Sequence, residues 1–424
     1  MRRRIILAVI LLTSFIVGQS QEKLSKDFNL DIYGFVRNDL IVDTYKGIDA
    51  GYDLFYLFPL YAGQDQNGED INECTSATLS AMSTRLGVKV DGPEIFGAKT
   101  NAVVEFDFLG ITKSEPTLFR IRHANVTFNW ENSKLLVGQT WHPFFGGSAY
   151  PIVAGLNTGA PFHAFNRSPQ IRYDYNVGQF QLSVAAVYEN QYTSKGLEAG
   201  GFVTGNQAQR NAVMPELVLT TEYHHAGVKI GAGAEVKRIK PCMTTVGTEG
   251  SFKLDETLTS AGLMAYIQYK KEKFSILAKG FYGQNMTHLT QVGGYGITSV
   301  DEATGAMTYT NYTNYTSLLN IVYGEKWQVG MFLGYGANLG TGEALYEYPT
   351  TGTALTKGVL PNVQDLARIA PHVSLNLSKI RLSAEYEMTT ANYGVGGFQF
   401  DDGLYADTHR TTNNRIIAVM TYFF

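Results

Sequence analysis

The chain contains sixteen segments, from about residue 30 to its last residue, in which apolar and polar residues alternate. In the last segment every even position is apolar: Ile416, Ala418, Met420, Tyr422 and Phe424. A period of two residues is that of a β-strand with one apolar face. One such segment is a weak signal, but sixteen in succession predict a protein built of β-strands.

The predicted strands are joined alternately by short turns and by long polar loops. They lie near residues 30–42, 82–90, 98–108, 118–130, 134–141, 168–176, 179–188, 214–224, 226–237, 259–270, 273–283, 313–324, 327–339, 367–377, 379–389 and 412–424. Short turns on one rim and long loops on the other are typical of an outer-membrane barrel. We therefore predict an all-β fold, a transmembrane antiparallel β-barrel of 16 strands with long extracellular loops and short periplasmic turns.

The composition agrees with this fold. The chain holds 44 Gly, 26 Tyr and 24 Phe, and its mean hydropathy is -0.10. Barrels do not stand out in hydropathy scans, because only alternate residues face lipid. A soluble β-sandwich or β-propeller is the alternative. A sandwich does not require alternation in every strand, however, and a propeller would show an internal repeat that we do not find.

The N-terminal residues predict export. Three arginines follow Met1, an apolar run covers residues 5–17, and polar residues follow at once. This order is typical of a secretory signal peptide. We expect a signal peptide at residues 1–20, a short periplasmic leader at 21–27 and the barrel at 28–424. The predicted location is the outer membrane of a Gram-negative bacterium.

Several classes of function are not supported by the sequence. The net charge is -4 and no basic block follows the signal peptide, which argues against nucleic acid as a partner. The histidines are scattered and no nucleophile, base and orienting group come together, so we predict no enzyme. Neither CxxC pairs nor HExxH occur, and we predict no metal site and no cofactor. For Cys74 and Cys242, a disulfide and two free thiols both remain open.

Sixteen strands leave an aqueous channel inside the barrel. The loop at about residues 143–167 is unusually apolar, "PFFGGSAYPIVAGLNTGAPFHAFNR". Folding inward against the barrel wall would bury these residues, so we expect this loop to narrow the channel. The alternative is a loop that packs against its extracellular neighbours.

The charge around this loop predicts which solutes pass. No Asp or Glu occurs from residue 132 to residue 173. We expect six arginines to line the narrow zone, where guanidinium groups bind carboxylate or phosphate through two donors. They are Arg37, Arg85, Arg120, Arg122, Arg167 and Arg172.

Two features complicate this charge prediction. Arg120 and Arg122 share their parity with apolar residues such as Val126, so a bulge near His123 is needed to turn them inward. The lumen charges could also form mixed ladders, in which the acids would offset the arginines. The acids concerned are Asp31, Asp39, Glu105, Asp107 and Asp174.

The stretch "FRIRHANVTFNWENSKLLVGQTWHPFF", preceded by "NAVVEFDFLG" and followed by "SPQIRYDY", resembles the DcaP-like family of trimeric outer-membrane porins. The resemblance covers mainly residues 101–175. It implies a homotrimer, an inward third loop and uptake of small anions such as dicarboxylates. The terminal aromatics Tyr422 and Phe424 resemble the assembly signal that the barrel-assembly machinery recognises. No heptads occur between residues 21 and 28, so the family's periplasmic coiled coil is not expected here.

These observations together predict a porin for passive diffusion of small hydrophilic solutes, favouring anions. Its partners would be those solutes and the lipid of the outer membrane. The alternative is a surface receptor or adhesin that acts through its extracellular loops. Aromatic residues in the first loop, from Tyr45 to Tyr61, could provide such a contact surface, although a loop lid over the barrel also explains them.

Overall fold

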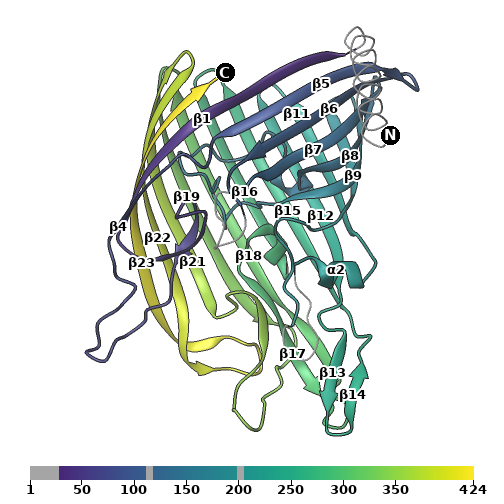
Figure 1. Ribbon diagram of the computed structural model, residues 1–424, viewed down its shortest axis with the longest axis vertical. Helices are drawn as coiled ribbons and strands as arrows, with labels where there is room; N and C mark the ends of the chain where they lie inside the picture. Colours follow the sequence, from purple (N-terminus) through teal and green to yellow (C-terminus); the bar gives the residue numbers. More distant parts are fainter. Residues whose placement is uncertain (1–27, 111–117, 198–204) are drawn as a thin grey trace, which may run out of the picture.

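The computed structural model describes residues 28–110, 118–197 and 205–424. The expected signal peptide and leader lie outside these residues. The described chain forms one closed wall of antiparallel strands (Figure 1). The wall consists of β1 (Asn29–Asp43), β4 (Ser76–Ser80) continued by β5 (Arg85–Ile95), β6 (Ala98–Asp107), β7 (Arg120–Asn129), β8 (Ser133–Trp141), β9 (Arg167–Val177), β10 (Phe180–Val187), β11 (Glu216–His225), β12 (Val228–Ile239), β15 (Leu258–Lys271), β16 (Phe274–Gln284), β18 (Met307–Gly324), β19 (Trp327–Thr341), β21 (Val363–Leu377), β22 (Ile380–Phe398) and β23 (Tyr405–Phe423). Because β4 and β5 both pair with β1 as parts of one strand, the described wall has 16 strands, which confirms the predicted fold class.

The barrel closes between its first and last strands. β1 pairs antiparallel with β23, with Arg37 opposite Thr421 and Val42 opposite Ile416. At the end of this seam the backbone N–H of Phe424 donates to the carbonyl oxygen of Gly34 at 3.2 Å. The terminal residues that alternate in the sequence therefore complete the wall.

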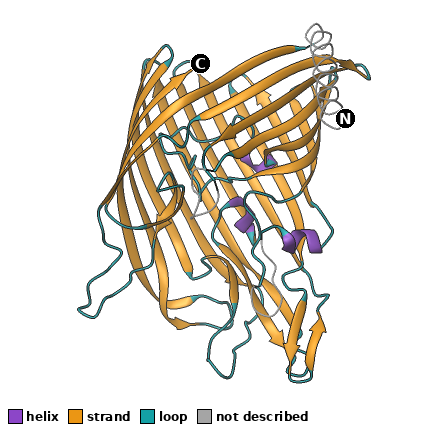
Figure 2. Ribbon diagram, viewed as in Figure 1, coloured by secondary structure: helices purple, strands orange, loops and turns teal. Residues whose placement is uncertain are grey.

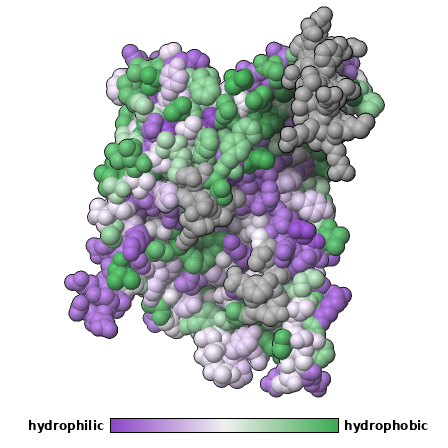
Figure 3. Space-filling view, viewed as in Figure 1, coloured by the Kyte–Doolittle hydropathy of each residue, from purple (hydrophilic) through white to green (hydrophobic). Residues whose placement is uncertain are grey.

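The wall strands alternate between a lipid-facing and an inward side, as predicted. On β23, Ile416 is 58% exposed whereas its neighbour Arg415 is 1% exposed. Exposed aromatic side chains lie near both ends of the strands, as membrane interfaces favour. Near the short turns these are Phe96, Phe180, Tyr323, Trp327, Tyr422 and Phe424, and near the long loops Phe108, Phe119, Tyr188 and Tyr282. Figure 3 shows apolar side chains over the strands and hydrophilic ones on the loop that projects between β3 and β4.

A bulge in β7 turns two predicted site residues, Arg120 and Arg122, to the inner side of the wall. His123 lies opposite Glu105, but Ile121 lies opposite the next residue, Phe106. Arg122 is therefore the extra residue and points inward, where it is buried, while Ile121 is exposed on the outside. The bulge confirms the irregularity that the sequence required near His123.

The remaining elements belong to the long connections. The short strands pair as β2 (Gly47–Ala50) with β3 (Phe55–Pro59), β13 (Thr244–Gly247) with β14 (Gly250–Lys253), and β17 (Gly293–Val300) with β18 and with β20 (Thr356–Val359). Three short helices, η1 (Pro143–Phe145), α2 (Gln207–Asn211) and η2 (Met286–Leu289), lie within these connections (Figure 2). Cys74 is exposed, Cys242 is buried, and both are free thiols.

None of the described helices is both long enough and apolar enough to span a membrane.

Candidate functional site

The connection between β8 and β9, residues 142–166, is called here the inner loop. Its apolar side chains are buried against the inside of the wall. Phe144 and Phe162 are fully buried, and the Phe162 ring lies 6.2 Å from that of Phe332 on β19. Phe145 stacks on Trp141, at the end of β8, with ring centroids 4.0 Å apart. These contacts account for the apolar composition of the loop.

Hydrogen bonds tie the inner loop to strands far apart around the wall. The backbone N–H of Ile152 donates to Asn320 on β18 at 2.8 Å. The N–H of Ala154 donates to the Glu385 carboxylate on β22 at 2.7 Å. From β1, the Arg37 guanidinium donates to the carbonyl oxygen of Ala154 at 2.8 Å. Since these strands occupy different parts of the wall, the loop crosses the interior of the barrel (Figure 1).

The first connection also enters the barrel, which the sequence analysis did not predict. Phe55 and Phe58 of β3 are buried. Arg368 on β21 donates to the carbonyl oxygen of Leu57, and the Tyr393 hydroxyl on β22 donates to that of Pro59 at 2.7 Å. The aromatic residues of this connection could have indicated that it enters the barrel, but a lid over the barrel would explain them equally well.

A cavity of about 550 Å³ lies beside the inner loop, and its wall extends from residues next to long connections, such as Leu109 and Trp141, to residues near short turns, such as Gln328. Residues 150–156 and Thr158 of the inner loop form one side of it. Among the described residues no Asp or Glu lines this cavity. Five arginines on the wall do so: Arg37, Arg85, Arg120, Arg122 and Arg381.

The acids of this region lie behind the arginines. Arg120 contacts Asp107 at 2.6 Å, and Arg122 contacts Glu105 at 2.7 Å and Asp107 at 3.0 Å. The Arg120 side chain is 13% exposed, whereas that of Asp107 is 2% exposed. The mixed ladder considered from the sequence is thus present, but its positive members face the cavity.

The two other arginines predicted for the narrow zone do not line this cavity. Arg167 is fully buried, with its guanidinium 4.6 Å from the centre of the Trp141 ring. Arg172 lies 3.2 Å from Asp174 and lines a second cavity of about 540 Å³ near a short turn, together with Glu222. Four of the six predicted arginines therefore line the first cavity, and Arg381 lines it as well. In the sequence, the position of Arg381 between the apolar residues Ile380 and Leu382 indicated that it faces inward.

One group of described residues could hold a metal ion, although the sequence analysis predicted none. It consists of His142, Glu216, Glu235 and His288, all buried, with one potential ligand atom from each lying within 4.8 Å of the others. These residues come from four separate elements. No local spacing motif could have revealed them.

Comparison with solved structures identifies the architecture. The outer membrane channel DcaP of Acinetobacter baumannii superposes with a TM-score of 0.68, covering 94% of this chain and 98% of that one at 20% identity. The outer membrane protein OmpT of Vibrio cholerae superposes with a TM-score of 0.54, covering 94% and 98% at 13% identity. The fold is that of a Gram-negative outer-membrane porin. No protein-family model matches the sequence, and no curated protein matches it either.

A third structure, OmpF of Salmonella typhi in complex with daunomycin, superposes with a TM-score of 0.50, covering 93% of this chain and 97% of that one at 9% identity. At these identities the porin likeness describes the fold alone. What the protein does must therefore be argued from its own interior.

Proposed function

We propose that this protein is an outer-membrane porin through which small hydrophilic solutes diffuse passively, with a preference for anions. One observation carries the proposal. Beneath a loop that crosses the barrel, the described wall of the cavity presents five arginines and no carboxylate. The porin fold supports the same function.

The electrostatic argument is local. Fixed positive charge lowers the entry barrier for anions most where the channel is too narrow for salt to screen it fully. Glu105 and Asp107 lie directly behind Arg120 and Arg122, so they reduce the positive potential without reversing it. The selectivity should therefore be moderate.

The class of solute follows from the guanidinium groups. Each can bind two oxygens of one carboxylate or phosphate, and several converge on one cavity. We propose carboxylates as the preferred anions, and dicarboxylates among them because of the resemblance to DcaP-like porins. The same proposal includes three further points. They are export by a signal peptide at residues 1–20, recognition of Tyr422 and Phe424 during assembly, and a homotrimer. A solved trimer form of OmpT of Vibrio cholerae, with a TM-score of 0.51, supports the last of these.

The receptor or adhesin alternative has less support. The aromatic side chains Phe55, Tyr56 and Phe58, which could have formed a contact surface, are buried inside the barrel. A protein that acts only through its loops would not conduct ions.

Liposome swelling tests the proposed function. Vesicles that contain the purified protein should swell faster in a small dicarboxylate than in an uncharged sugar of similar size. Vesicles without protein are the control for leakage. Equal rates for the two solutes would reduce the proposal to a general diffusion pore, and no swelling in any solute would contradict it.

A further inference from the structure

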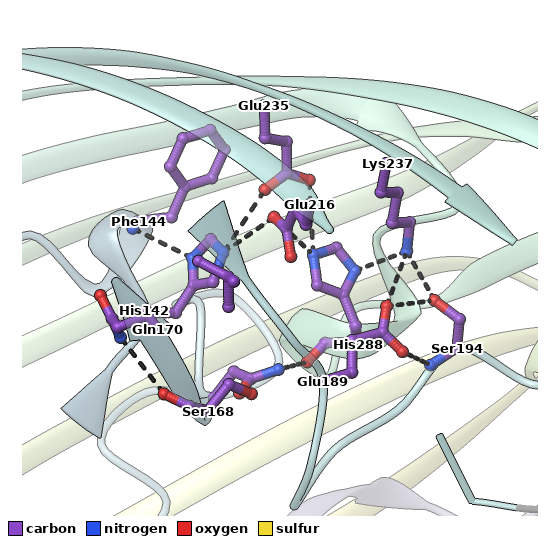
Figure 4. A network of polar contacts seen from close by, with 12 residues as sticks. His142, Phe144, Ser168, Gln170, Glu189, Ser194, Glu216, Glu235, Lys237 and His288 are labelled. Atoms are coloured by element: carbon purple, nitrogen blue, oxygen red, sulfur yellow. Dashed lines mark hydrogen bonds and ion pairs between the residues drawn. The ribbon is translucent and has the colours of Figure 1, made fainter. Parts of the chain in front are cut away.

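Four buried residues meet at the base of the inner loop, and we call them the His–Glu cluster. They are His142 at the start of the inner loop, Glu216 on β11, Glu235 on β12 and His288 in η2. Figure 4 shows the two carboxylates placed between the two imidazole rings. The cluster therefore joins the base of the inner loop to the wall and to the connection after β16.

The distances within the cluster match a small coordination shell. His142 Nε2 lies 2.8 Å from Glu216 Oε1 and 3.9 Å from Glu235 Oε2. His288 Nε2 lies 3.4 Å from Glu216 Oε1 and 3.5 Å from Glu235 Oε1. A tetrahedral Zn²⁺ site with bonds of about 2.0–2.1 Å has ligands about 3.4 Å apart. The four separations scatter around that value.

The cluster lacks a fixed positive partner for its two carboxylates. Within the described residues neither Glu216 nor Glu235 forms an ion pair with a lysine or an arginine. The nearby Lys237 amino group instead lies 2.7 Å from His288 Nδ1 and 3.8 Å from Glu189. Buried carboxylates without a cation or a full set of donors are costly.

Several atoms of the cluster residues have no hydrogen-bond partner. They are Glu216 Oε2, Glu235 Oε2 and His288 Nε2, and all three residues are at least nine-tenths buried. Two carboxylate oxygens and one ring nitrogen, buried in a group whose four potential ligand atoms lie within 4.8 Å of one another, are a donor set for a metal ion rather than for an anion.

The outer nitrogen of each ring is also held, which fixes the direction of Nε2. The backbone N–H of Phe144 donates to His142 Nδ1 at 3.1 Å, and Lys237 contacts the corresponding atom of His288. With Nδ1 accepting, a neutral His142 carries its proton on Nε2 and donates it to Glu216. A metal ion can occupy Nε2 only in the other tautomer, with this proton on Nδ1, so the contact from the Phe144 N–H to Nδ1 must open when the ion binds.

We propose that the His–Glu cluster binds one divalent transition-metal ion of the Zn²⁺ class. Imidazole nitrogens and carboxylate oxygens are ligands that such ions accept, and four protein ligands would make the site closed and tetrahedral. The ion clamps the base of the inner loop to β11, β12 and the connection after β16. Because the cluster is buried, the ion enters as the barrel folds.

Refolding in the presence of metal tests this proposal. The full chain, without a polyhistidine tag, is unfolded in urea with a chelator and refolded into detergent with or without Zn²⁺. After desalting, elemental analysis should find about one Zn²⁺ per chain, and the metal-loaded barrel should unfold at a higher temperature than the metal-free one. Folding of each sample is checked by heat-modifiable migration in a gel.

Matched variants locate the ion. Glu235→Gln and His288→Gln should each weaken Zn²⁺ binding by at least about tenfold, since loss of an outer-shell partner alone costs about 10–100-fold. Glu385→Gln removes a buried carboxylate on another part of the wall and should leave binding unchanged. A second readout is Co²⁺, which should give the intense visible absorption of a tetrahedral site in the native chain and lose it in Glu235→Gln.

Two results would overturn the proposal. One is a native chain that refolds fully but retains no Zn²⁺ above the level of a metal-free control. The other is Zn²⁺ bound equally by the native chain and by both cluster variants. That result would place the ion on surface residues such as the exposed His224 and His225. Should one cluster variant fail to fold, His142→Gln takes its place.

Discussion

Two regions inside the same barrel bury pairs of carboxylates in opposite ways. Beside the cavity, Glu105 and Asp107 on β6 are each contacted by guanidinium groups. At the His–Glu cluster, Glu216 and Glu235 face imidazoles instead, and some of their oxygens have no partner. In the first arrangement both carboxylates have guanidinium partners, and these guanidinium groups face the channel. The second leaves buried carboxylate oxygens without a partner, which is why we propose passing anions for one region and a resident metal for the other.

The largest effect should follow from breaking the first arrangement. Arg122→Ala leaves the buried Glu105 and Asp107 short of donors, and we expect a loss of about 3 kcal/mol in the free energy of unfolding. Urea unfolding in detergent measures it. Arg410→Ala, which removes an exposed arginine, should change that free energy by less than about 0.5 kcal/mol. Equal losses in the two variants would mean that the Arg–carboxylate pairs do not stabilise the barrel.

A smaller effect is expected where the inner loop is attached beside the cavity. Glu385→Ala removes the acceptor for the N–H groups of Ala154 and Gly155, at a cost of about 2 kcal/mol. The loosened loop should also raise single-channel conductance. Ser383→Ala, which changes a cavity-lining residue on the same strand, is the control. Unchanged conductance in Glu385→Ala would show that the loop does not limit the flow.

The smallest effect should come from the second arrangement when no metal is present. In chelator, Glu235→Gln removes one of two facing carboxylates, so the free energy of unfolding should change by no more than about 1 kcal/mol. The same substitution should abolish the stabilisation that Zn²⁺ confers. A metal-free loss as large as that of Arg122→Ala would mean that hydrogen bonds alone complete the cluster.

The wall was predictable from the sequence because every lipid-facing strand must alternate. Even the bulge at Arg122 could be expected, since without it charged side chains would face lipid. The ends of β22 and β23 were less predictable. These strands extend to Phe398 and back to Tyr405, where their side chains no longer face lipid and the apolar period is lost.

The interior was only partly predictable. The four predicted arginines that line the cavity lie outside the acid-free stretch from residue 132 to residue 173. That stretch instead contains Arg167 and Arg172, which do not line the cavity. It could not show that Arg167 is buried on Trp141 or that Arg172 lies beside Asp174, because strand register and side-chain packing decide both. The His–Glu cluster joins residues 142, 216, 235 and 288, which only the closed wall brings together.

The most direct test of the central claim removes one cavity arginine without leaving an acid unpaired. Arg381 lines the cavity and its side chain donates to Asn376, whereas the exposed Arg410 makes the same kind of bond to Asn392. Reversal potentials are measured across a KCl gradient in a planar bilayer for the native protein, Arg381→Gln and Arg410→Gln. We predict anion preference in the native protein, a shift toward cations in Arg381→Gln and no shift in Arg410→Gln. Cation preference in the native protein, or equal potentials in all three, would contradict the account.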